Sequence, residues 1–190
     1  MQIFVDKECC QKKSNNIKSV IKEFYPYAKR TMGFDKDPVV FLRSDVPNSK
    51  DFFGKTAFYS PNENEVHLFL KDRHPKDIVR SFSHELVHHL QNCRGEFDRV
   101  YIGAPGIGEN GYAQGNAHLR EMEKEAYLTG NLVFRDWCDT ANRKSIIILE
   151  GKMSKEKEKK KTDKEWYNNS LFQTLKNKWA KPKGDKNGKS

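Results

Sequence analysis

The sequence predicts an α+β domain over residues 1–150, followed by a lysine-rich linker and an amphipathic C-terminal tail over residues 151–190. Two observations predict the fold class. Apolar side chains recur with the 3.6-residue period of a helix over residues 15–32, 75–93 and 118–138. Short runs over residues 39–42, 57–59 and 65–70 have the β-branched and aromatic composition of strands. A length of 190 residues suits one domain with an appendage.

The first expected helix covers residues 15–32, with Asn15 or Asn16 as its cap and Gly33 as its end. Pro26 lies inside this span and should kink or divide the helix, because proline removes a backbone donor and clashes with the preceding turn. The apolar stripe that would face the core consists of Ile17, Val20, Ile21, Phe24 and Ala28.

A small sheet is expected next. Residues 39–42 have the composition of a short buried strand, and residues 57–59 and 65–70 flank a segment with turn chemistry, which predicts a hairpin. In the second hairpin strand Val66 and Leu68 face one way, and His67 faces the other as an exposed strand residue.

The helix over residues 75–93 carries the run Ser83-His84-Glu85-Leu86-Val87-His88-His89-Leu90-Gln91. Pro75 suits its first turn, and Gly95 follows its end. Its core-facing stripe is Ile78, Phe82, Leu86 and Leu90. At about 100° per residue, His84 and His88 fall almost opposite that stripe, so we expect them to point away from the core.

His84 and His88 stand four residues apart on one helical face, so both imidazoles can reach a single metal ion. Glu85 follows the first histidine directly and can act on the attacking water as a general base. This pattern predicts a catalytic metal site of His84 and His88 with Glu85 as the catalytic residue.

Such a site needs a third protein ligand, and position 94, where a third histidine would stand, is Arg94. A glycine-rich loop over residues 95–116 leads to the next helix, which carries three glutamates. Glu123 lies about 60° from the centre of that helix's apolar stripe, Glu125 about 100° and Glu121 about 140°. Glu123 is therefore favoured, Glu125 is the alternative, and His118 is a further candidate.

These residues resemble the gluzincin metallopeptidases. His84-Glu-x-x-His88, followed at a distance by Glu123-x-x-Ala126, is similar to the minimal zincin-like domain of the ImmA/IrrE-like family, with an N-terminal helix, a small sheet, an HExxH helix and a glutamate helix. Tyr127 departs from the polar residue that often comes next in that pattern.

The resemblance implies a Zn²⁺ cofactor, a peptide or unfolded-protein substrate and endopeptidase activity. It also implies that an edge strand before the motif helix, here residues 65–70, pairs with extended substrate. Tyr112 would be the oxyanion donor, with His118 as the alternative. Two other functions are open: a metal-containing binding protein without catalysis, and a module tethered through its tail.

The tail motivates that second alternative. Residues 152–190 carry 13 lysines against 5 acidic residues, a net charge of +8 out of +9 for the chain, so they could bind nucleic acid or an anionic membrane surface. Beyond Lys161 a capping box precedes an amphipathic stripe. Residues 145–149 are expected to form a short strand or a buried end.

The remaining features predict a cytoplasmic protein. No apolar run approaches the roughly 18 residues that span a bilayer, and the first residues are charged too soon for a secretory signal. The four cysteines show no metal-binding spacing and suit a reducing compartment. We expect Cys93 to be a small buried hydrophobe.

Overall fold

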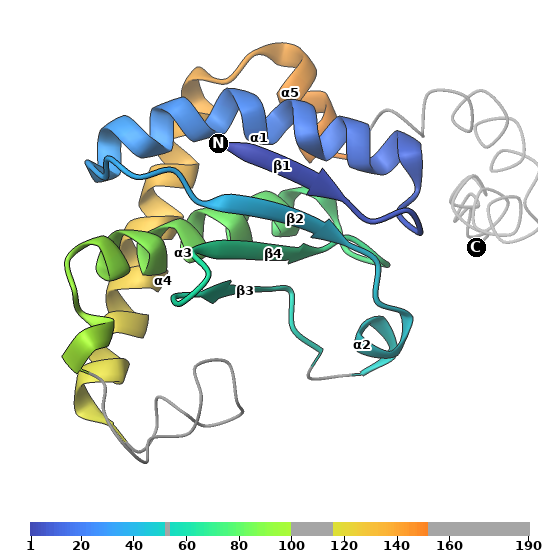
Figure 1. Cartoon of the computed structure of the whole chain (residues 1–190). Coiled ribbons are helices and arrows are strands. Elements are labelled where there is room, and N and C mark those ends of the chain that lie inside the picture. Colours follow the sequence, from blue (N-terminus) through green and yellow to red (C-terminus); the bar gives the residue numbers. More distant parts are fainter. Residues whose placement is uncertain (52–53, 100–115, 152–190) are drawn as a thin grey trace, which may run out of the picture. The chain divides into compact units, whose positions relative to one another are not determined.

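The computed structural model of the chain describes residues 1–51, 54–99 and 116–151 (Figure 1). Within these ranges it is an α+β fold, as predicted, and its one mixed sheet has four strands where three were expected. The first compact unit ends at Gly151. The predictions for Tyr112 and for the tail over residues 152–190 lie outside the described residues. None of the helices in the described ranges is long and apolar enough to cross a membrane.

The sheet has the strand order β1-β2-β4-β3. Strands β1 (Gln2–Val5), β2 (Val39–Arg43) and β4 (Glu65–Phe69) are parallel, and β3 (Ala57–Ser60) pairs antiparallel with β4. The β3–β4 hairpin is the predicted one. Strand β4, however, lies inside the sheet, because the predicted β2 and the unpredicted β1 continue the sheet on its other side. The edge strand next to β4 is β3.

Helix α1 (Gln11–Met32) buries the predicted stripe, and it ends at Gly33 with a left-handed φ of 79°. The expected cap at Asn15 or Asn16 is wrong, because the helix begins at Gln11 with Cys10 as its cap. The chain also continues through Pro26 as a single helix. Phe24 and Ala28 on either side of Pro26 are both buried, so tertiary packing offsets the missing backbone bond.

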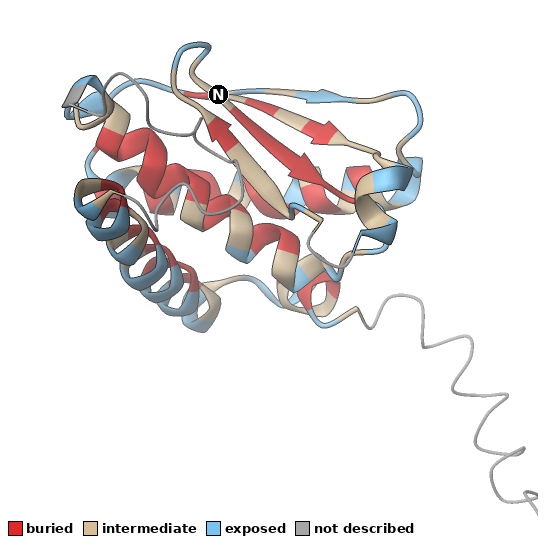
Figure 2. Cartoon of the chain, turned by 90° about the horizontal axis from the view of Figure 1, so that it is seen from below, coloured by how far each residue is buried: buried red, intermediate tan, exposed pale blue. Residues whose placement is uncertain are grey.

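Helix α3 (Pro75–Cys93) forms a middle layer. It contacts β3 and β4 on one side and α4 (Ala117–Thr140) on the other. Figure 2 shows α3 as a largely buried helix between the sheet and the half-exposed α4. Val40, Leu42, Val66 and Leu68 of the sheet are completely buried against the helices. The motif helix is therefore held rigidly from both sides.

Two shorter α-helices and the 3-10 helix η1 (Phe97–Arg99) complete the described fold. Helix α2 (Val46–Lys50) was not predicted; the side chain of Asp45 caps it by accepting a hydrogen bond from the Asn48 backbone. The predicted strand at 145–149 is wrong, because this segment is helix α5 (Arg143–Leu149), although its end is buried as expected. Asn142 caps α5, and Glu23 of α1 accepts a hydrogen bond from the Ser145 hydroxyl at 2.6 Å. Capping and packing thus override the local β preference of three isoleucines.

Candidate metal centre

Helices α3 and α4 cross at a glycine. A Cβ on Gly130 of α4 would lie 3.0 Å from His84 Cα and 3.2 Å from the Ser83 carbonyl oxygen, so only glycine allows this close approach. The Ser83 hydroxyl also donates a hydrogen bond of 2.7 Å to the Gly130 carbonyl. The crossing therefore fixes α4 against the part of α3 that begins the histidine motif.

Three side chains from the two helices converge beside this crossing. His84 Nε2 lies 3.1 Å from His88 Nε2, Glu123 Oε1 lies 3.2 Å from His88 Nε2, and Glu123 Oε2 lies 3.4 Å from His84 Nε2. A tetrahedron with metal–ligand bonds of about 2.0–2.2 Å has edges of roughly 3.3–3.6 Å. The shortest distances in the cluster are close to these edges, and the carboxylate reaches the two rings with different oxygens. One ligand atom from each residue lies within 4.8 Å of the others, so the cluster could hold a metal ion.

The charges in the cluster favour an ionised carboxylate. Burial alone would raise the pKa of Glu123, but the His84 and His88 rings, which donate hydrogen bonds to this carboxylate when they are protonated, outweigh burial and lower the pKa to about 2. For His88, burial opposes the charged ring, and the carboxylates of Glu123 and Glu85 together raise its pKa. Glu123 is therefore an anion at neutral pH, as a metal-binding carboxylate must be.

Glu85 lies against the edge strand. Its side chain is buried, with 7% of the residue exposed. Burial raises the pKa of its carboxyl, while His88, His84 and a hydrogen bond from the Tyr59 backbone act in the opposite direction. Since burial wins, Glu85 takes up a proton more readily than an ordinary glutamate.

The three glutamates of α4 have different partners. Glu123 joins the two histidines, whereas Glu125 accepts hydrogen bonds from Gln91 and from Arg94, and Glu121 pairs with Lys124. His118 lies away from the cluster: its Nε2 is 3.1 Å from the Glu96 carbonyl oxygen and 3.3 Å from the Glu96 carboxylate. The structure thus brings together His84, His88 and Glu123.

The orientation of the histidines differs from the expectation. They do not point away from the protein interior, because α4 packs on that side of α3; His88 is only 5% exposed. The Tyr127 ring lies edge-to-face on His84, with centroids 4.6 Å apart. Tyr127 is itself exposed, so it borders the cluster from the solvent side.

Sequence reasoning missed Gln91, which lies within hydrogen-bonding distance of His88. Gln91 follows His88 by three residues, and side chains at that spacing share a helical face, so the spacing itself was the signal that could have identified it. The sequence held no comparable signal for the contact between Gly130 and α3. The stripe of small and large residues on α4 shows which face is buried, but not which residue of α3 packs against Gly130.

Two other expectations change with the tertiary structure. His67 is buried, not exposed: its ring stacks between Phe41 and Phe58, and its Nδ1 accepts a hydrogen bond of 2.7 Å from Arg43 Nε. Cys93 is exposed, because it stands about 200° around α3 from Gln91, the side chain of this turn that bonds to α4. All four cysteines are free thiols.

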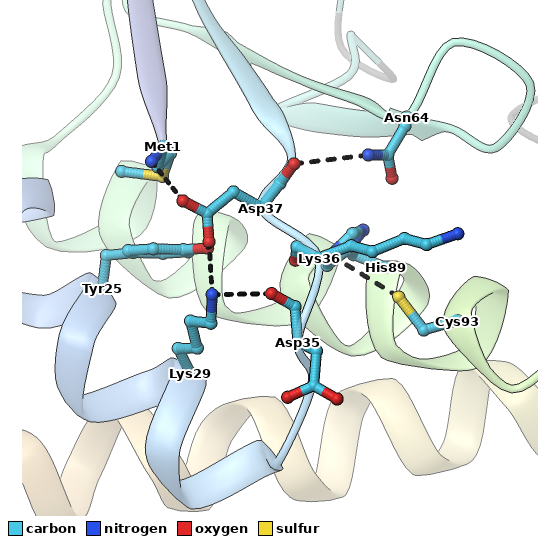
Figure 3. Close-up of polar contacts among 9 residues, drawn as sticks. All are labelled: Met1, Tyr25, Lys29, Asp35, Lys36, Asp37, Asn64, His89 and Cys93. Carbon is cyan, nitrogen blue, oxygen red and sulfur yellow. Dashed lines mark hydrogen bonds and ion pairs between the residues drawn. The ribbon is translucent and has the colours of Figure 1, made fainter.

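His89 anchors α3 rather than joining the cluster. Its Nε2 lies 2.8 Å from the Lys36 carbonyl oxygen and its Nδ1 lies 3.2 Å from the Tyr59 hydroxyl. Figure 3 shows His89 next to the segment before β2, with the Cys93 thiol beyond it. This histidine therefore ties the motif helix to the loop between α1 and β2.

Comparison of the chain with protein-family models, with curated proteins and with solved structures finds no match.

Proposed function

We propose that this protein is a zinc-dependent endopeptidase with the minimal zincin-like layout that its motif resembles. The observation that carries the proposal is the convergence of His84, His88 and Glu123, whose nearest nitrogen and oxygen atoms lie 3.1–3.4 Å apart, with Glu85 next to the first histidine. The order of elements, from a helix and a small sheet to the motif helix and the glutamate helix, agrees with that layout.

In this proposal His84, His88 and Glu123 hold the metal. Their donor set of two imidazole nitrogens and one carboxylate fits a catalytic zinc site, which keeps a further position for water or substrate. Zinc bound there would polarise the scissile carbonyl and lower the pKa of the attacking water towards about 7.

Glu85 is the proposed general base. It accepts the proton of the attacking water and later donates it to the leaving amine. The raised pKa of its buried carboxyl supports this role, because a carboxylate with a raised pKa accepts a proton from water more readily.

An extended peptide is the proposed substrate, paired along β3 as the edge strand next to β4. The hydrogen bond from the Tyr59 backbone to the Glu85 carboxylate supports this choice, because it brings the proposed base to that strand. Backbone pairing selects for an unfolded segment and not for one particular side chain. Tyr112 as oxyanion donor stays a prediction.

Metal analysis of the purified protein, with Glu85→Gln as the matched variant, tests the proposal. We expect stoichiometric zinc in both proteins and cleavage of an unfolded protein by the wild type alone. Absence of zinc, with none bound on addition, would refute the metal site. Zinc in both proteins with no cleavage by either would identify a metal-containing binding protein without catalysis. Equal cleavage by both proteins would refute Glu85 as the general base.

The charge of residues 152–190 motivates a separate proposal, that they bind nucleic acid or an anionic membrane surface. Deleting them should abolish binding that weakens with salt, as measured with a nucleic-acid duplex and with anionic vesicles. Equal binding with and without these residues would refute it.

A further inference from the structure

We infer that Gln91 is a positioning residue that holds His88 in the tautomer whose Nε2 is free to bind a metal. The inference deepens the proposed function because it concerns the same metal site, but it rests on contacts that are independent of catalysis. Gln91 is completely buried on α3, one turn beyond His88.

The Gln91 amide has one orientation that satisfies its neighbours. Its nitrogen lies 2.9 Å from the Met122 carbonyl oxygen and 2.9 Å from Glu125 Oε2. Both neighbours are acceptors, and only the amide NH₂ group can donate to them. The opposite orientation would place the amide oxygen against two other oxygens, so Oε1 must point towards His88.

This orientation decides the tautomer of His88. Gln91 Oε1 lies 2.8 Å from His88 Nδ1 and can only accept a hydrogen bond, so Nδ1 carries the proton. In the neutral ring Nε2 is then unprotonated, and this is the atom that faces His84 and Glu123. A metal-binding imidazole needs that free nitrogen, and the bond made by its other nitrogen selects it.

The amide is itself anchored across the helix pair. One carboxylate oxygen of Glu125 on α4 accepts the hydrogen bond from Gln91. Its other oxygen accepts a hydrogen bond of 2.7 Å from Arg94 Nη1. Arg94, Glu125, Gln91 and His88 therefore form a continuous chain of hydrogen bonds that joins α3 to α4 behind the cluster. This arrangement gives Glu125 a role different from that of Glu123: it orients the group that orients His88.

Two variants of the full chain distinguish a role of Gln91 in orienting His88 from a role in filling space between the helices. Gln91→Met keeps the side-chain volume but removes the acceptor for His88. The exchange variant Gln91→Glu with Glu125→Gln keeps an acceptor for His88 and provides a donor towards residue 91. Because its other carboxylate oxygen would face the Met122 carbonyl oxygen, its readout is the tautomer of His88 and not the affinity for zinc. Asn92→Leu is the matched control, because Asn92 is the next amide on α3 but bonds to Tyr59 and Pro61.

The first measurement is the tautomer of His88, from two-bond ¹H–¹⁵N spectra of the zinc-free protein with neutral rings. The second is the zinc dissociation constant from competition with a chelator. We expect the Nδ1–H tautomer in the wild type, the control and the exchange variant. Gln91→Met should lose it and bind zinc about 10–100-fold more weakly.

Retention of the Nδ1–H tautomer and of wild-type zinc affinity in Gln91→Met would overturn the inference. So would an exchange variant that loses the Nδ1–H tautomer of His88, and this variant keeps the test decisive if Gln91→Met does not fold. The tautomer is measured without metal or substrate. A wild type that binds no zinc would therefore refute the proposed function, while the spectrum would still test the role of Gln91.

Discussion

Replacing Gly130 by alanine should push α3 and α4 apart at the site. The new methyl group would meet His84 Cα at 3.0 Å, His84 N at 3.1 Å and the Ser83 carbonyl oxygen at 3.2 Å. These are backbone atoms of a helix, so none can rotate away as a side chain would. The helices must therefore separate by a few tenths of an ångström to restore ordinary contact distances.

Two opposing effects set the size of the change. Alanine in a helix interior is about 0.5–1 kcal/mol more stable than glycine. Overpacking a tight interior costs about 1–3 kcal/mol. Because the contacts at Gly130 are with backbone, we expect overpacking to win by about 1 kcal/mol, which lowers Tm by roughly 2–4 °C for a domain of this size.

The same separation should weaken metal binding. His84 and His88 belong to α3 and Glu123 belongs to α4, so the distance between the helices sets the distances between ligand atoms. Metal–ligand distances tolerate only about 0.2 Å of error. We expect the zinc dissociation constant of Gly130→Ala to rise by about tenfold, in the range of other changes to the supporting shell.

Denaturant unfolding and zinc titration measure both effects, with Asn131→Ala as the control. Asn131 is the next residue on α4 and is exposed, so this change adds helix propensity without a clash and should stabilise by a few tenths of a kcal/mol. If Gly130→Ala is stabilised as much as Asn131→Ala and binds zinc like the wild type, the close approach does not determine the site.

Three further outcomes follow from the contacts of other groups. Glu123→Gln should lose zinc by about 100-fold or more, whereas Glu125→Gln should retain most of it, as measured by chelator competition. Chelation should lower the Tm of the wild type but not of Glu123→Gln, because zinc at about 100 times its dissociation constant adds about 2.7 kcal/mol. Asp37→Asn should destabilise the fold by at most about 1 kcal/mol at neutral pH, and the difference should vanish on acidification, as measured by urea midpoints.

The sign of the Asp37 effect comes from its partners. Hydrogen bonds from Lys29, from the Met1 ammonium group and from Tyr25 hold the pKa of this carboxyl far below its usual range (Figure 3). Because the pKa of Asp37 is lower in the folded than in the unfolded protein, the ionised carboxylate stabilises the fold at pH values above the unfolded pKa of about 3.9. This stabilisation is lost as the pH falls towards the folded-state pKa. The side chain is 39% exposed, so solvent screening limits the size of the effect.

A different result would contradict each of these three predictions. Equal zinc loss in Glu123→Gln and Glu125→Gln would contradict the assignment of Glu123. A chelator effect on Tm that persists in Glu123→Gln would place the stabilising metal elsewhere. A constant difference between the wild type and Asp37→Asn from neutral to acid pH would show that charge is not the cause.

Some errors of the sequence interpretation have a common cause. Residues 145–149 have the composition of a strand but form α5, because Glu23 of α1, more than a hundred positions away, bonds to its capping turn. His67 alternates away from the core as expected, yet it is buried, because Phe41 and Phe58 come beside it only when β2 and β3 flank β4. Residues distant in sequence therefore determine both the helical structure of residues 145–149 and the burial of His67.

The sequence by itself determined the features that depend on local periodicity: the α+β class, the stripes of α1, α3 and α4, and the placement of His84 and His88 on one helical face. These follow from the fixed rotation per residue along a helix or strand. Only the tertiary structure decided which glutamate meets the histidines and which residue orients His88. Both depend on the depth and rotation at which α4 packs on α3, and contacts at Gly130 and Gln91 set that packing.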